Sequence, residues 1–71
     1  MTLDQLETLV RLMRGKIDSV AVQSAKLVLV DGMSQTDAAR KLNQKTNTVN
    51  NGVMRYKNAD EAIKKAYSIE S

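Results

Sequence analysis

Apolar positions recur at helical spacing along most of the chain and predict an all-α domain. The first apolar face comprises Leu3, Leu6, Leu9, Val10 and Met13. A helix is therefore expected over about residues 3–14. Thr2 can cap this helix, because Gln5 lies three residues further on, as a capping box requires. Gly15 follows at the point where the helix should have ended.

The segment 18–32 is compatible with two structures. The apolar run 27–30, followed by Asp31-Gly32, is typical of a strand that enters a hairpin. However, the residues after Gly32 do not alternate, so the hairpin would lack its second strand. One helical face of the segment carries Ala21, Ala25, Val28 and Leu29. We therefore expect a helix that ends at Gly32 with a left-handed cap.

Three further helices are expected after Gly32. They cover about residues 34–42, 46–57 and 58–69, with Ser34, Thr46 and Asn58 as their N-caps. Asn43-Gln44-Lys45 would form the turn between the first two. Residues 1–71 are thus predicted to form a single small domain of five helices and no sheet. A core of this size is marginal on its own, so either idealised helix packing or oligomerisation is needed.

Composition excludes several classes of protein. Cysteine and histidine are absent, which excludes a disulfide and a Cys/His zinc site. The longest apolar run, 27–30, is far shorter than the roughly 20 residues that a membrane span requires. The chain has no paired-carboxylate motif and no phosphate-cradling loop. We therefore expect neither an enzyme nor a metal, a cofactor, a small-molecule substrate or a membrane as a partner.

The positive charge is concentrated in one part of the chain. Residues 33–57 contain Arg40, Lys41, Lys45, Arg55 and Lys57 against Asp37 alone, a net charge of +4. Residues 1–32 sum to zero and residues 58–71 to −1. Cations clustered in this way would neutralise phosphates when nucleic acid binds. An ordinary solvated helix face is the alternative that charge alone leaves open.

Residues 34–57 have the spacing of a helix-turn-helix. With Gln35 as the first position, Ala39 is the small residue where the two helices cross, and Leu42 is the apolar residue that fills the angle between them. Asn43 is the turn residue, and Val49 anchors the second helix inward. Glycine is usual at the turn because the backbone often needs a positive φ there, and Asn43 is the next most tolerant residue type. Gly52 departs from the pattern, because a branched aliphatic residue is expected at its position.

The outer face of the second of these helices is rich in amides. Asn47, Asn50, Asn51 and Met54 point the same way, since they lie at i, i+3, i+4 and i+7. Asparagine is a poor helix former, but its amide can pair with adenine in the major groove. We predict base reading by Asn47, Asn50, Asn51, Met54 and Arg55. Contacts to DNA phosphates are predicted for Gln35, Arg40, Lys45, Thr46, Thr48 and Lys57.

Residues 25–56, AKLVLVDGMSQTDAARKLNQKTNTVNNGVMRY, resemble the DNA-binding core of the KorA/TrfB plasmid repressors. The resemblance rests on Val28-Leu29-Val30-Asp31-Gly32 and, without a gap, on Gln35, Ala39, Leu42, Val49, Val53 and Arg55. It implies a helical repressor of bacterial plasmid genes, located in the cytoplasm, that binds a palindromic operator in double-stranded DNA as a homodimer. In the family, glutamine matches Asn51 and arginine matches Arg55, both in the DNA-facing helix. The family also has a longer C-terminal dimerisation segment than this chain.

A dimer is also expected because one recognition helix reads only a few base pairs, so specificity needs two half-sites. We predict the dimer surface on the last helix, at Ala59, Ala62, Ile63, Ala66 and Tyr67. Packing of that helix on its own domain is the alternative. The alternative function is a helical adaptor that binds another protein, such as RNA polymerase or a partner regulator. Only DNA binding should weaken steeply with added salt.

Overall fold

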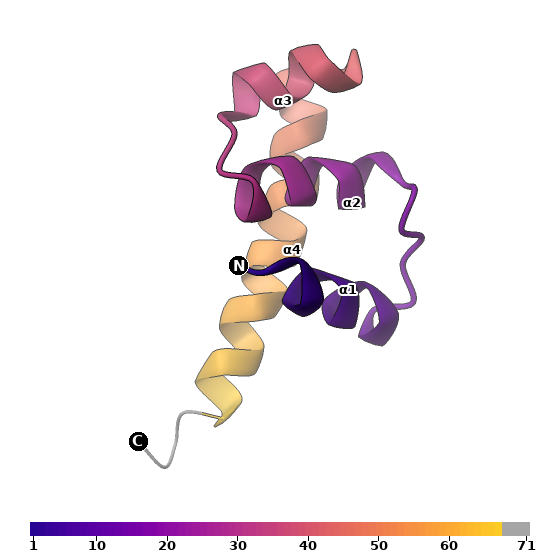
Figure 1. The fold of residues 1–71 in the computed structure, drawn as a ribbon. Helices are drawn as coiled ribbons and strands as arrows, with labels where there is room; N and C mark the ends of the chain where they lie inside the picture. Colours follow the sequence, from indigo (N-terminus) through magenta and orange to yellow (C-terminus); the bar gives the residue numbers. More distant parts are fainter. Residues whose placement is uncertain (68–71) are drawn as a thin grey trace.

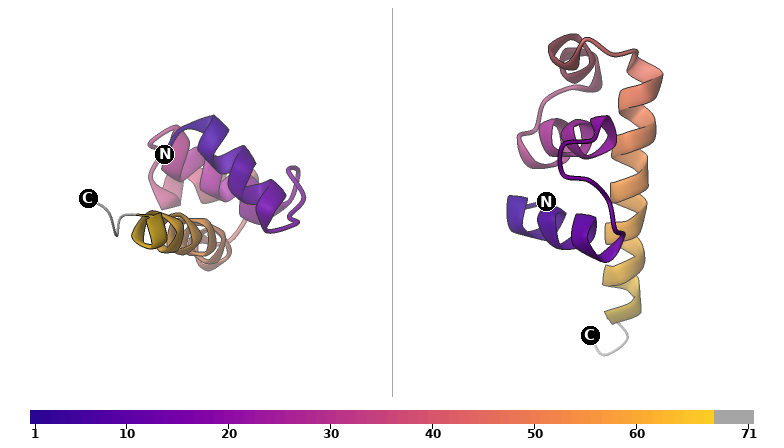
Figure 2. Two further views of the ribbon diagram at one scale, coloured as in Figure 1. Left: turned by 90° about the horizontal axis from the view of Figure 1, so that it is seen from below. Right: turned by 90° about the vertical axis from the view of Figure 1, so that its right-hand side faces the viewer.

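The computed structural model describes residues 1–67, and all regular structure in that range is helical (Figure 1). The elements are α1 (Leu3–Leu12), α2 (Val20–Ala25), the π-helix η1 (Lys26–Val30), α3 (Gln35–Leu42) and α4 (Thr46–Tyr67). α1, the continuous segment formed by α2 and η1, and α3 lie one above another along one side of α4 (Figure 2). The all-α prediction is therefore confirmed. No helix within residues 1–67 has both the length and the hydrophobicity to cross a membrane.

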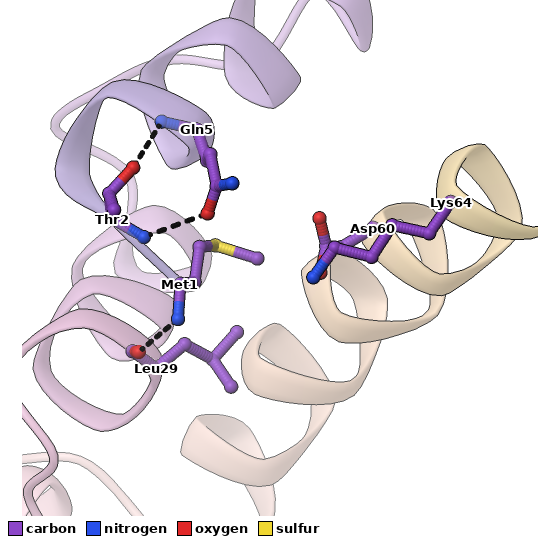
Figure 3. Close-up of polar contacts among 6 residues, drawn as sticks. All are labelled: Met1, Thr2, Gln5, Leu29, Asp60 and Lys64. Atoms are coloured by element: carbon purple, nitrogen blue, oxygen red, sulfur yellow. Dashed lines mark hydrogen bonds and ion pairs between the residues drawn. The ribbon is translucent and has the colours of Figure 1, made fainter. Parts of the chain in front are cut away.

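The start of α1 is fixed by the predicted capping box. The Thr2 Oγ1 accepts a hydrogen bond from the Gln5 amide at 3.2 Å, and the Thr2 amide donates to Gln5 Oε1 at 2.9 Å (Figure 3). At the other end, the left-handed residue is Arg14, with φ 55°. It lies one residue before Gly15, which was expected to mark the end of the helix. Gly15 instead leaves room for the Tyr56 side chain, because a Cβ on Gly15 would lie 2.7 Å from the Tyr56 hydroxyl.

The helix expected over 18–32 is present, and no hairpin forms. Ser19 caps it, with its Oγ accepting from the Val22 amide at 3.2 Å. The last turn widens into η1, and Gly32 follows with φ 76°, which confirms the left-handed cap. The α-amino group of Met1 donates to the Leu29 carbonyl at 3.3 Å and so ties the start of the chain to η1 (Figure 3).

The local signals around α3 are also confirmed. The Ser34 Oγ accepts from the Asp37 amide at 3.1 Å, as an N-cap should. Asn43 ends the helix in the left-handed region with φ 54° and ψ 45°. The chain then turns into α4, and the Lys45 carbonyl accepts the first hydrogen bond of that helix from the Val49 amide at 3.2 Å.

The predicted boundary at Asn58 is wrong. α4 is continuous from Thr46 to Tyr67, so residues 1–67 contain four α-helices where five were expected. The inward apolar stripe does not stop at Tyr56: Ala59 packs on the core and Ile63 lies beside α1. Because asparagine is only modestly unfavourable inside a helix, this packing outweighs its capping preference. The predicted end of the last helix, at residue 69, lies outside the described residues.

Two groups of buried side chains form the core, and α4 contributes to both. The first core cluster contains Leu6, Leu9, Val10, Val22, Ala25 and Tyr56. The second core cluster contains Leu27, Ala38, Ala39, Val49 and Val53. Between them, the backbones of α2 and α4 cross so closely that a Cβ on Gly52 would lie 2.7 Å from the Ala21 Cα. α4 is therefore the spine on which the shorter helices pack.

Candidate nucleic-acid interface

The N-terminal half of α4 is fixed by the side that it buries. Val49 and Val53 pack with Ala38 and Ala39 of α3 in the second core cluster. Gly52 is buried against α2. With α2 and α3 both on this side, the opposite side of the helix faces solvent over its first three turns.

The predicted base-reading residues lie on that free side. Asn47, Asn50, Asn51, Met54 and Arg55 are all exposed. At about 100° per residue, the sector opposite the buried valines is occupied by Asn47, Asn51 and Met54. Asn50 lies at one margin of this sector. The structure therefore brings three amides and a thioether onto one continuous surface.

Asn58 belongs to the same stripe, although its sequence context predicts an N-cap at this position. It is exposed and lies four residues after Met54 and seven after Asn51 in an uninterrupted helix. We call Asn47, Asn51, Met54 and Asn58 the amide stripe. It extends for about 16 Å, at 1.5 Å per residue. Asn58 lies about three helical turns after Asn47, so the helical repeat alone places it on this stripe. The predicted start of a new helix at Asn58 hid this relation.

The predicted phosphate contacts on α4 divide between its two flanks. Thr48 lies on the flank next to α2. Arg55, a predicted base-reading residue seven positions further on, shares this flank, and both residues line a hollow with Val20. Thr46 and Lys57 are eleven residues apart and share the other flank. Both flanks are exposed. The amide stripe therefore runs between two polar or cationic margins.

The remaining predicted phosphate contacts lie outside α4. Gln35 is half-buried at the start of α3, and Lys45 is exposed in the turn. Arg40 is exposed and lies 3.8 Å from the Asp37 carboxylate. A solvent-exposed pair of this kind contributes little to stability, so Arg40 can exchange this partner for another anion at little cost.

Four of the five predicted dimer residues are exposed. The fifth, Ala59, is half-buried and packs on the first core cluster. Ala62, Ala66 and Tyr67 are exposed, and Ile63 is 37% exposed.

Ile63 lines a mainly apolar groove between α1 and α4 with a volume of about 340 Å³. We call this the α1–α4 groove; its lining residues are Asp4, Gln5, Thr8, Leu9, Leu12, Asp60, Ile63 and Lys64. At its rim, Lys64 Nζ lies 2.9 Å from Asp60 Oδ2 (Figure 3). Leu12 is 67% exposed and was not foreseen as part of this surface.

Comparison with protein-family models, curated proteins and solved structures found no match to this chain. The resemblance to the KorA/TrfB family therefore stays a prediction from the sequence. Within residues 1–67, acidic side chains do not gather into a group that could hold a metal ion.

Proposed function

We propose that this protein is a sequence-specific DNA-binding repressor in which α3, the turn and the N-terminal half of α4 act as a helix-turn-helix. The observation that carries the proposal is the exposed amide stripe on a helix whose opposite side is buried. Four asparagines on a single helix lower its intrinsic stability. DNA recognition accounts for them, because it needs side chains that both donate and accept hydrogen bonds.

The chemistry favours a half-site that contains adenine and thymine. An asparagine amide can donate to adenine N7 and accept from its N6 amino group at the same time, and a good pair of this kind discriminates by about 1–3 kcal/mol. Met54, with an exposed apolar side chain, suits a thymine methyl group. The net charge of +4 in residues 33–57 would supply affinity that does not depend on sequence. Repression would follow from occupying a promoter.

The protein would act as a homodimer on a palindromic operator. One α4 reads too few base pairs for useful specificity, and a second copy related by a two-fold axis would double the site. The α1–α4 groove and the exposed end of α4 supply an apolar surface suited to that contact. The repressor role and the plasmid setting rest on the resemblance to the KorA/TrfB family.

Selection from random duplex DNA by the purified protein, followed by sequencing, tests the proposal. An enriched palindrome is expected. On that sequence, Asn51→Ala should weaken binding by about 1–3 kcal/mol and leave binding to random DNA unchanged, whereas Lys45→Ala should weaken both. Retention without an enriched motif would contradict sequence-specific repression. If no DNA is retained, the proposal is wrong and the protein adaptor becomes the better explanation.

A further inference from the structure

A hollow of about 290 Å³ lies between the first turn of α2 and the N-terminal half of α4. Its apolar wall is formed by Val20, Ala21 and Gly52. Its polar wall is formed by Thr48, Asn51 and Arg55. The hollow adjoins the close crossing of the two helices, where Gly52 keeps the backbones together.

The polar wall can donate several hydrogen bonds to one anion. Arg55 brings a guanidinium fork, which matches the oxygens of a phosphate group. Thr48 adds a hydroxyl donor on the same flank. In the part of the chain that the structure describes, no carboxylate lines the hollow or forms an ion pair with Arg55. A negatively charged group is therefore the ligand that this wall fits.

The position of the hollow identifies the source of that anion. Thr48 and Arg55 lie about 90° and about 70° around the helix axis from the middle of the amide stripe, both on the same flank. When the stripe faces the floor of the major groove, a flank at this angle faces one wall of the groove. The walls of the groove are the sugar-phosphate backbones of the two strands.

We infer that the hollow is the seat of one backbone phosphate of bound DNA, held mainly by Arg55 and supported by Thr48. The inference rests on the proposed function and changes the role of Arg55 from base reading to phosphate binding. Asn51 belongs both to the amide stripe and to the polar wall of the hollow, and it keeps its predicted base contact. Val20 and Ala21 form the apolar side of the seat.

The salt dependence of DNA binding tests the inference. Binding of a fluorescein-labelled random-sequence duplex is measured by anisotropy over a series of salt concentrations. Arg55→Gln should reduce the slope of log K against log salt by about 1, because one phosphate contact is lost. Arg55→Lys should keep the slope, since it keeps the charge. Arg11→Gln, an exposed cation on α1, is the matched control and should change nothing.

The other outcomes are distinct. If Arg55→Gln leaves the slope on random DNA unchanged but alters the base preference in a selection experiment, Arg55 reads a base and the inference is wrong. If wild-type protein does not bind DNA at all, the proposed function itself fails.

Inorganic phosphate is the alternative source of the same anion. A titration followed by the amide NMR signals of Thr48 and Arg55 distinguishes the two sources. Saturable binding of phosphate that added duplex does not displace would overturn the assignment to DNA. Displacement of phosphate by duplex would support it.

Discussion

Gly52 shows how a single residue fixes the position of the candidate interface. A helix-turn-helix usually has a branched aliphatic residue here, and the glycine is a departure from that pattern. In the structure, its missing side chain lets α2 and α4 cross in contact, with an added Cβ 2.7 Å from the Ala21 Cα and 2.9 Å from its carbonyl oxygen. Both neighbours are backbone atoms, which cannot rotate away as a side chain can.

Gly52→Ala should therefore destabilise the protein. Alanine is favoured over glycine in a helix by about 1 kcal/mol, but forced separation of two packed backbones typically costs about 1–3 kcal/mol, and the clash here is severe. Urea unfolding should give a lower free energy of unfolding than that of the wild type. An unchanged or higher value would mean that α2 and α4 do not cross as described.

The residues that could be predicted from the sequence are those whose roles are local. Thr2, Ser34 and Asn43 act through hydrogen bonds or backbone angles within a few residues, and their predicted roles are confirmed. The role of Gly52 depends on Ala21, thirty-one positions earlier in the chain. No local pattern contains that information, so the glycine could only be recognised as an exception.

At the scale of elements, the continuity of α4 changes the candidate site. Asn58 followed three residues later by Glu61 has the form of a helix start, and such signals are read over one turn only. Past Asn58, Ala59 packs on the first core cluster and Ile63 lies beside α1 in the groove, and a local signal does not include this packing. The helix boundary was missed for this reason, and with it one residue of the amide stripe.

Asn58→Ala should move stability and DNA binding in opposite directions. At an exposed position inside a helix, alanine should raise the free energy of unfolding by about 0.5 kcal/mol, whereas loss of an N-cap would lower it by about 1 kcal/mol. Thermal or urea unfolding distinguishes the signs. Binding to the selected operator should weaken, because an amide of the stripe is lost. A destabilised variant would show that Asn58 caps a separate helix.

At the scale of the whole molecule, the described residues extend over 42 × 21 × 18 Å, with α4 along the length. The end of α4 projects past α1 and leaves Tyr67 84% exposed (Figure 2). Leu12 and Ile63 line the adjoining α1–α4 groove. Because the core is small, burial of this apolar surface against a second copy would add to the stability of the domain.

Leu12→Asp should therefore convert the proposed dimer into monomers. The leucine is mostly exposed, so the fold of each copy should survive, while a carboxylate in an apolar contact would be costly to bury. Sedimentation measures the oligomeric state directly. Leu3→Asp is the control, because this exposed leucine of α1 does not line the groove. A Leu12→Asp dimer would place the interface elsewhere, and a monomeric wild type would contradict the dimer.

The unbroken course of α4 has a mechanical consequence. Its 22 residues make a rod about 33 Å long, with the amide stripe along its N-terminal half and the groove residues in the turns that follow. With no hinge between them, a dimer held at the groove would present its two reading surfaces at a fixed separation and a fixed angle. The number of residues between Met54 and Ile63 would then determine the phase of the operator. The phase is the angle around the DNA helix that separates the two half-sites.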